Sequence, residues 1–422
     1  MNGPQAPAHR RTAPRRSDLP AGPARRPPGT HAVLGAILDH GPVARSTVAR
    51  LTGLSPASVT GHCGHLLERG LIREGSETTG PRGLGRPHIP LEIDTGRHLV
   101  AGAHIAVRHV TLSLMDLRGR IVAEERRPHR GTEPGAVLHG LAARLPRLVA
   151  RHAAGRTVLA LGVATGHRVD PAAGTIVDHP QLGWREVPAR EVLHRATGLP
   201  VHVDSHARAL ARAEQLIGEP STRDSAVLLF VGTVVDAAFT TAGTVHLGPH
   251  AGAGSVAHLP VGAPPRAPDP TVQEPCTCGS TECLQAQVSE PAMVRRAAEQ
   301  GPAVPDFPAL LDLALAGEPR ARALFADRAR RVGRAAALLL DMFDPAVLVV
   351  VEPGTGRLPE CTAALRAEVA ERSRVCEDPA RAVVPSSFTG SVLAVAGASV
   401  ALGALYADPL GPWPTLALGA PS

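Results

Sequence analysis

The chain has 422 residues and no lysine, because all 44 of its basic side chains are arginine. Aromatic residues make up only 2% of the chain, so a folded core must be built mainly from Ala, Val and Leu. No apolar run reaches the length of about 20 residues needed to cross a bilayer. The first residues are rich in Arg and Pro and contain no secretory apolar segment. We therefore expect a cytoplasmic protein, in which clustered cysteines indicate metal binding rather than disulfides.

Charge is concentrated at the N-terminal end of the chain. The formal net charge of +6 is the sum of +7 in residues 1–90 and −1 in the other 332 residues. Such a basic end favours a partner with a dense negative backbone, such as double-stranded DNA. A solvated basic tail without a partner is the alternative.

The N-terminal third of the basic segment, residues 1–29, is rich in Pro and Arg and is predicted to be a disordered arm. Residues 30–95 have a different pattern. Apolar residues recur at helical spacing, and Ser55 followed by Pro56 is a typical start for a third helix, predicted to end near Arg69. Three helices followed by a β-hairpin predict a winged helix-turn-helix domain over residues 30–95.

Five side chains of this domain are candidates for contacts with an operator. Ser58, Thr60 and His62 lie on the third helix, which would enter the major groove and contact bases or phosphates. Arg82 and Arg86 lie in the predicted wing, where arginine can enter the minor groove or contact phosphate. A three-helix domain that binds another protein is the alternative.

The remainder of the chain alternates between strands and helices twice, which indicates two α/β lobes. We predict a first lobe over residues 96–204, completed by a C-terminal helix at about 391–410, and a second lobe over residues 205–390. Within the first lobe, residues 186–197 are predicted to form a helix. A length of 422 residues agrees with two or three domains.

Three cysteines lie within eight residues of one another at Cys276, Cys278 and Cys283. Thiolates at this spacing, on a loop that contains Gly, can wrap around one Zn²⁺, and a tetrahedral structural site needs a fourth ligand. His258 lies upstream and is the predicted fourth ligand. Unliganded thiols are the alternative.

The cysteine run Cys276–Leu284, preceded by a Gly-rich stretch that ends in His258, resembles the zinc signature of the ROK family (repressors, open reading frames, kinases). Gly83–Pro87 is similar to the wing ending of the family's regulators. Phe343–Pro345 before a Val-rich strand and Ala407–Leu410 after the last helix also match. The resemblance implies an α/β fold: an N-terminal winged helix-turn-helix followed by a two-lobed actin/hexokinase-like (ribonuclease H-like) body. It also implies a homodimer or homotetramer and sugar-responsive repression.

The resemblance does not extend to the family's catalytic parts. Family kinases have Asp-x-Gly-x-Thr where this chain has His104–Arg108, and Gly-Thr-Gly-x-Gly where it has Gly232–Asp236. His206 stands at the place of the catalytic Asp. These replacements predict that the chain is not an enzyme. A sugar kinase that phosphorylates a hexose with ATP is the alternative, as is an interaction scaffold that binds neither DNA nor sugar.

The positions that contact sugar in the family are also altered. The candidates for an effector pocket are Ser205, His206, Arg208, Ser255 and His258. Two interpretations remain open: the pocket accepts a sugar or another small molecule, or the body is a dimerisation scaffold without an effector. Together the patterns predict a DNA-binding transcriptional regulator, a repressor of carbohydrate-related genes, with a non-catalytic ROK body.

Overall fold

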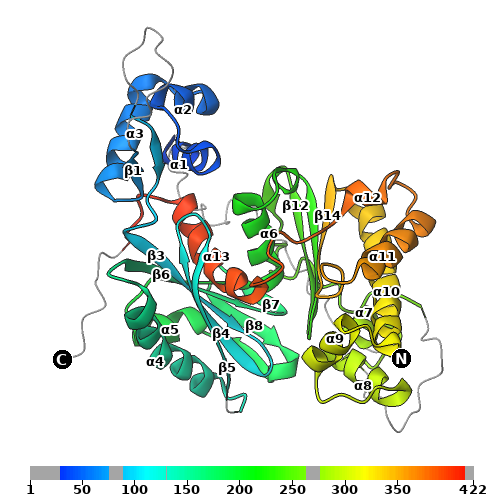
Figure 1. Ribbon diagram of the computed structural model, residues 1–422. Coiled ribbons are helices and arrows are strands. Elements are labelled where there is room, and N and C mark those ends of the chain that lie inside the picture. The colour runs from blue at the N-terminus through cyan, green and yellow to red at the C-terminus, as the bar shows by residue number, and fades with distance from the viewer. Residues whose placement is uncertain (1–28, 76–88, 130, 263–275, 414–422) are drawn as a thin grey trace, which may run out of the picture.

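The computed structural model describes residues 29–75, 89–129, 131–262 and 276–413 of the chain. They form a small helical domain at the N-terminal end, coloured blue in Figure 1, and a larger body built on two five-stranded sheets. No helix among these residues is both long and apolar enough to cross a membrane.

The N-terminal domain contains three helices and a two-stranded antiparallel sheet. The elements are α1 (Gly29–His40), α2 (Arg45–Thr52), α3 (Pro56–Glu68), β1 (Ile72–Glu74) and β2 (Leu91–Ile93). Apolar side chains from all three helices meet in one core, which includes Val33, Ile37, Val48, Val59 and Leu66. The predicted winged helix-turn-helix arrangement is thus the fold of this domain. The tip of the predicted wing, residues 76–88, lies outside the described residues.

The start of α3 follows from its sequence. Ser55 has extended backbone and its side chain accepts the N–H of Ser58 at 3.1 Å, while Pro56 occupies the first helical position, where no N–H is needed. This cap fixes the direction in which α3 leaves the turn after α2.

The first lobe of the body is built on a mixed sheet with the strand order β10-β6-β3-β4-β5. Leu99, Ala101 and Ala103 of β3 point into the core beneath α4, whereas Val100 belongs to the core beneath α13. The sheet is therefore covered on both faces, as the alternation of side chains along a strand requires. The elements of this layer are β3 (His98–Ile105), β4 (His109–Asp116), β5 (Ile121–Pro128), α4 (Pro134–His152), β6 (Thr157–Thr165), α5 (Ala189–Thr197), β10 (Val201–Ser205) and α13 (Val392–Ala407).

A separate three-stranded antiparallel sheet lies between β6 and α5 in the sequence, with the strands β7 (Arg168–Asp170), β8 (Thr175–His179) and β9 (Trp184–Val187). The helix expected over residues 186–197 is shorter, because Glu186 lies in β9 and α5 begins only after Pro188. Proline disfavours helical backbone in the residue before it, which keeps the chain extended up to that point.

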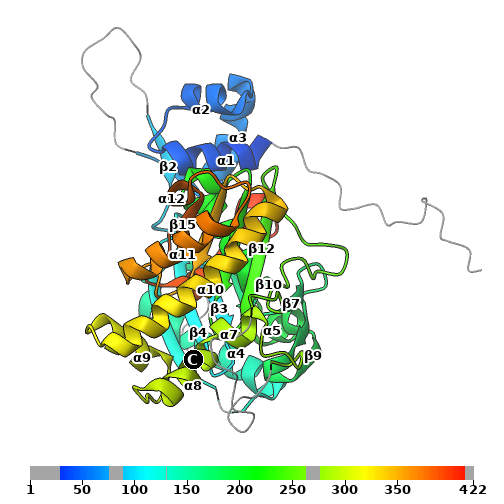
Figure 2. The same ribbon diagram turned by 90° about the vertical axis from the view of Figure 1, so that its right-hand side faces the viewer.

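The second lobe is built on the sheet β13-β12-β11-β14-β15, with helices on its outer side. The long helix α10 packs against α11 and α9, as Figure 2 shows in yellow and orange. The elements are β11 (Ala226–Val231), β12 (Val235–Thr241), β13 (Thr244–Val245), α7 (Leu284–Val288), α8 (Glu290–Gln300), α9 (Phe307–Leu315), α10 (Pro319–Phe343), β14 (Val347–Val351), α11 (Pro359–Arg372), α12 (Pro379–Ala382) and β15 (Val383–Pro385). Two α/β lobes are thus confirmed.

Two helices connect the lobes. Helix α6 (His206–Ile217) packs against α13 and also against β11 and β12, so this helix pair lies between the two sheets (Figure 1). Helix α13 approaches β3 through backbone contacts: a Cβ atom at Gly102 would lie 2.3 Å from the Ala398 nitrogen, and one at Gly397 would lie 2.6 Å from the Ala103 nitrogen.

The N-terminal domain is attached to both lobes at the end of α1. Asp39 forms a bidentate ion pair with Arg223 of the second lobe, with both oxygen–nitrogen distances at 2.8 Å. The neighbouring Leu38 carbonyl accepts from Arg118, in the β4–β5 turn of the first lobe, at 3.4 Å. The N-terminal domain therefore contacts both lobes of the body at once.

The close approach of α13 to β3 gives a test with a control on the same helix. We expect Gly397→Ala to lower the free energy of unfolding by about 1–3 kcal/mol, because the added methyl group meets strand backbone that cannot rotate away. Gly403→Ala has open space around the new Cβ and should leave stability unchanged or raise it by up to about 1 kcal/mol. Urea unfolding followed by circular dichroism measures both, and equal effects would contradict this account of the packing.

Candidate functional site

Three of the predicted DNA contacts lie on α3 in the described part of the chain. Ser58 and Thr60 are exposed. The Thr60 hydroxyl donates to the Pro56 carbonyl at 2.9 Å and lies on the outer surface of the helix. His62 is only half-exposed. Its Nδ1 lies 2.9 Å from the hydroxyl of Thr30, so its ring faces the start of α1 instead of the open surface of α3.

The remaining predicted contacts, Arg82 and Arg86, lie outside the described residues and stay predictions. His65, which the helical pattern also places away from the apolar face of α3, is exposed. It follows Ser58 by seven residues, a spacing that brings two residues to the same face of a helix.

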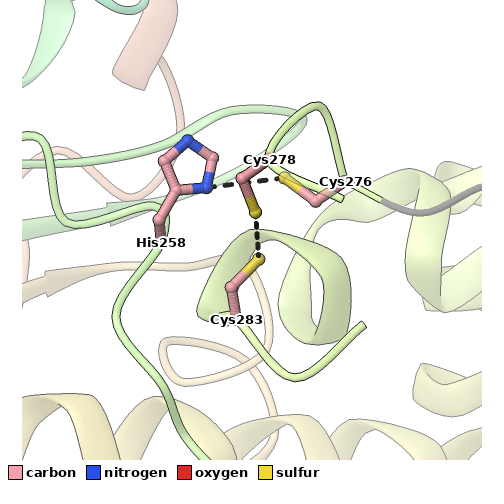
Figure 3. Close-up of side chains that lie close together, drawn as sticks. All are labelled: His258, Cys276, Cys278 and Cys283. Atoms are coloured by element: carbon pink, nitrogen blue, oxygen red, sulfur yellow. Dashed lines mark hydrogen bonds between the residues drawn. The ribbon is translucent and has the colours of Figure 1, made fainter. Parts of the chain in front are cut away.

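The four predicted metal ligands come together in the second lobe (Figure 3). Their ligand atoms all lie within 4.8 Å of one another, with His258 Nδ1 at 3.5 Å from Cys276 Sγ and Cys278 Sγ at 3.8 Å from Cys283 Sγ. Ligands bound tetrahedrally to zinc, about 2.3 Å away for sulfur and about 2.0 Å for nitrogen, are separated by about 3.5–3.8 Å. The donor set and its spacing fit a zinc ion.

Local structure explains why these ligands converge. Gly279 has left-handed backbone at φ 81°, and its N–H donates to the Cys276 carbonyl at 2.7 Å, which makes a tight turn that carries two of the thiols. The Leu284 N–H donates to the Leu259 carbonyl at 2.8 Å and so fixes the His258 segment beside Cys283. Two sequence-distant segments are thereby held together at the metal ligands.

The thiols differ in their electrostatic surroundings. Burial raises the pKa of the Cys283 thiol to about 12 in the metal-free chain. A backbone hydrogen bond from Ser280 lowers the pKa of Cys278, which is exposed. A metal ion that binds these groups displaces their protons, since thiolate is the ligand form.

A cavity of about 390 Å³ lies between the lobes. Of the five predicted effector-pocket residues, only His206 lines it. The Ser205 side chain caps α6, while Ser255 is exposed on the loop that precedes the metal ligand His258.

Arg208 is also occupied within the protein fold. Its guanidinium is buried, pairs with Asp204 at 2.7 Å and donates to the Val169 carbonyl at 2.6 Å. Of the predicted effector-pocket residues, His206 thus lines the cavity, and the other four lie elsewhere in the fold.

His206 belongs to a buried polar network that the sequence did not reveal. Its Nε2 lies 3.1 Å from Asp236 Oδ2, and its Nδ1 lies 3.3 Å from Nε2 of His104, whose ring is stacked on it. Burial, followed by the proximity of His206, lowers the pKa of His104 well below the usual range. Burial alone would raise the pKa of Asp236. The hydrogen bond with His206 and the nearby rings of His206 and His167 outweigh burial and lower that pKa.

The loop at Gly232–Asp236, which matches a phosphate loop in the family, has its polar groups committed inside the protein. The Val235 N–H donates to Gln285 Oε1 at 2.8 Å, and the Gln285 amide donates back to the Thr233 carbonyl at 2.7 Å. The Thr233 hydroxyl donates to the Glu290 carboxylate at 2.7 Å. A phosphate here would find a carboxylate and occupied N–H groups.

The other segment that matches a phosphate-binding motif of the family, His104–Arg108, also has a backbone donor engaged within the protein. The Ala106 N–H, at the end of β3, donates to the His109 carbonyl at 2.9 Å and so closes the β3–β4 turn on itself. The Ala106 side chain takes the place of the hydrogen atom that glycine would leave there. The Ala106 N–H and the Val235 N–H, one at each of these two positions, are therefore both engaged within the protein.

Fold and site together define a class of protein: a winged helix-turn-helix domain joined to a two-lobed, sugar-kinase-like body that carries a Cys₃His cluster. The family model described as ROK family matches residues 100–401, and the model of the MarR family matches residues 26–80. The chain belongs to the ROK family, which confirms the resemblance found in the sequence.

Individual relatives agree with this assignment. The transcriptional regulator Rv0485 of Mycobacterium tuberculosis is 33% identical over 408 residues, which is 91% of this chain and 89% of the relative. The N-acetylglucosamine repressor of Escherichia coli O157:H7 is 26% identical over 334 residues, 76% of this chain and 79% of the relative. The crystal structure of a ROK family transcriptional regulator, a homologue of the Escherichia coli MLC protein, has a TM-score of 0.72 at 22% identity. The match covers 90% of this chain and 96% of that one, and shows the likeness of the fold.

The buried imidazoles predict a pH dependence of stability. Burial lowers the pKa of His179 from 6.5 to about 3, so below pH 6.5 the unfolded chain binds a proton that the folded chain does not. The free energy of unfolding should therefore fall as the pH decreases below about 6.5, by up to about 1.4 kcal/mol per pH unit for one such group. His179→Gln should flatten this decline in urea titrations, whereas His139→Gln, at an exposed position on α4, should leave it unchanged. A slope equal in all three proteins would contradict the assignment.

Proposed function

We propose that this protein is a DNA-binding transcriptional repressor that acts in the cytoplasm as a homo-oligomer and does not phosphorylate a substrate. The observation that carries the proposal is the combination of an exposed polar recognition helix with phosphate loops whose donors are engaged internally. The names of the relatives support it. Two copies of the domain, related by a two-fold axis, would bind two half-sites of an inverted repeat.

We infer further that a small molecule in the cavity between the lobes changes the position of the DNA-binding domain. Helix α6 begins at the cavity with His206, and near its other end Gln215 donates to the Arg223 carbonyl at 2.8 Å. Arg223 in turn forms the ion pair with Asp39 at the end of α1. Movement of α6 thus reaches the attachment point of the DNA-binding domain through direct contacts. The relative named for N-acetylglucosamine supports carbohydrate-related genes as the targets.

The Cys₃His cluster would hold a structural Zn²⁺. All four ligand positions would be filled by protein side chains, so no position would remain open for a substrate, which is the arrangement of structural zinc sites. When bound, the ion supplies a cross-link between the His258 segment and the start of α7.

DNA binding can be tested with operator fragments that the purified protein itself selects from the genomic DNA of its source. We expect gel-shift affinity for such a duplex to fall steeply with salt, because arginines release counterions from phosphates. Thr60→Ala should weaken binding about three- to tenfold, because it removes an exposed α3 hydroxyl that would hydrogen-bond to the operator. Thr244→Ala, the same change at an exposed site on β13, is the control and should not alter binding.

Two results would overturn the proposed function. One is the absence of salt-sensitive binding to any duplex at micromolar protein. The other is ADP release from ATP in the presence of a hexose, abolished by His206→Ala.

For the metal, elemental analysis should find about one zinc per chain. Cys278→Ser should remove it and lower the melting temperature by about 5–10 °C, because the two segments lose their cross-link. Cys376→Ser changes a half-exposed cysteine outside the cluster and should retain the zinc. Zinc retained in the Cys278→Ser protein at full occupancy would refute this ligand set.

A further inference from the structure

We propose that the cavity between the lobes binds an uncharged, largely hydrocarbon molecule that carries a hydroxyl group, and not a sugar or a nucleotide. The statement that this molecule acts as the effector rests on the proposed function. The chemical class of the molecule rests on the cavity alone.

Apolar side chains of both lobes form much of the cavity wall, beside polar side chains such as Thr233, Ser386 and Ser391. Both lobes contribute aliphatic or aromatic side chains, and a ligand that fills the space would contact them over most of its surface. Each hexose hydroxyl that faced these apolar side chains without a partner would cost about 1–3 kcal/mol. The side chains concerned are Ile105, Val107, Phe230, Phe307, Leu311 and Val350.

The charged groups at the cavity disfavour an anion. Glu352 is buried, lines the cavity and is paired with Arg328, which leaves no free positive charge at that point. Glu290 lines it as well and accepts the Thr233 hydroxyl. Arg126 and Arg357, which also line the cavity, are exposed side chains whose charge is screened by solvent. A nucleotide phosphate would therefore meet the buried Glu352 and the partly exposed Glu290 where it would need donors.

The hydroxyl group of the ligand is inferred from which ring nitrogens of His104 and His206 donate and which accept hydrogen bonds. When the His206 ring is neutral, the Asp236 carboxylate beside its Nε2 favours the proton on that nitrogen, so Nδ1 of His206 accepts from Nε2 of His104. Because burial lowers the pKa of His104 and keeps its ring neutral, its Nδ1 is then an acceptor, and it is buried without a partner among the described residues.

A second unpartnered atom lies beside it. Thr111 is directly opposite His104 in the β3–β4 pair, lines the same cavity, and its buried Oγ1 also has no partner in the described part of the chain. Side chains opposite each other on two strands are close neighbours. A hydroxyl group can donate to the imidazole nitrogen and accept from the threonine, which neither a carboxylate nor a hydrocarbon can do.

The proposal can be tested with the full chain and an uncharged fluorescent probe, N-phenyl-1-naphthylamine, whose emission rises in apolar surroundings. We expect saturable binding and displacement by 1-naphthol at a concentration at least about tenfold lower than by 1-naphthoate, because the carboxylate loses hydration on burial. Millimolar glucose and millimolar ATP should not displace the probe.

Substitutions that fill the cavity test whether the probe binds there. Leu311→Trp fills the space from the second lobe and Val392→Trp fills it from the start of α13, and each should weaken probe binding about tenfold or more. Leu338→Trp, at an exposed leucine on α10 that does not line the cavity, is the matched control. His104→Phe retains an aromatic ring but removes the acceptor nitrogen, and should reduce the advantage of 1-naphthol over naphthalene by up to about tenfold.

Displacement by glucose or ATP would overturn the proposal, as would equal potency of 1-naphthol and 1-naphthoate. Probe binding that is unchanged in folded Leu311→Trp and Val392→Trp proteins would also overturn it. Because none of these measurements contains DNA, a failure of the proposed function is distinguishable. If 1-naphthol binds in the cavity but leaves operator affinity unchanged, its role as an effector is refuted while the ligand class is retained.

Discussion

The contact between α13 and the central strand of the first lobe positions most of the molecule. At Gly102 and Gly397 the helix and the strand meet backbone to backbone, so no side chain separates them. With α13 fixed in this way, α6 packs beside it and the second sheet packs against α6. The end of β3, which carries His104, is thereby placed opposite the second lobe, and the cavity between the lobes depends on this spacing.

The cavity lies beside the two positions that match phosphate loops of the family. One backbone N–H at each position makes a hydrogen bond within the protein, to Gln285 at one loop and to the β3–β4 turn at the other. A pair of stacked imidazoles, His104 and His206, stands beside the Asp236 carboxylate. The protein thus contains a cavity lined by side chains of both lobes, with this buried polar group at its wall.

The sequence predicted the two-lobed plan and the winged helix-turn-helix domain because their signals are local: periodicity, an N-cap at Ser55 and closely spaced cysteines. The metal cluster was predictable since three of its ligands lie within eight residues. The cavity was not, because distant segments from both lobes line it. Arg208 was taken for a pocket residue, yet it follows Asp204 by one helical turn, and that spacing favours the ion pair which the structure contains.

The attachment of the DNA-binding domain has a mechanical consequence. Its first helix ends beside Arg223 from the second lobe and Arg118 from the first, and Arg69 after α3 also donates to carbonyls of the C-terminal segment. A rigid domain cannot keep its contacts to both lobes when the lobes separate. Any hinge rotation between the lobes must therefore break one of these contacts or tilt the domain. In a symmetric pair of chains the two domains would tilt in opposite senses. A small change in the angle between the lobes would then change the distance between the two α3 helices.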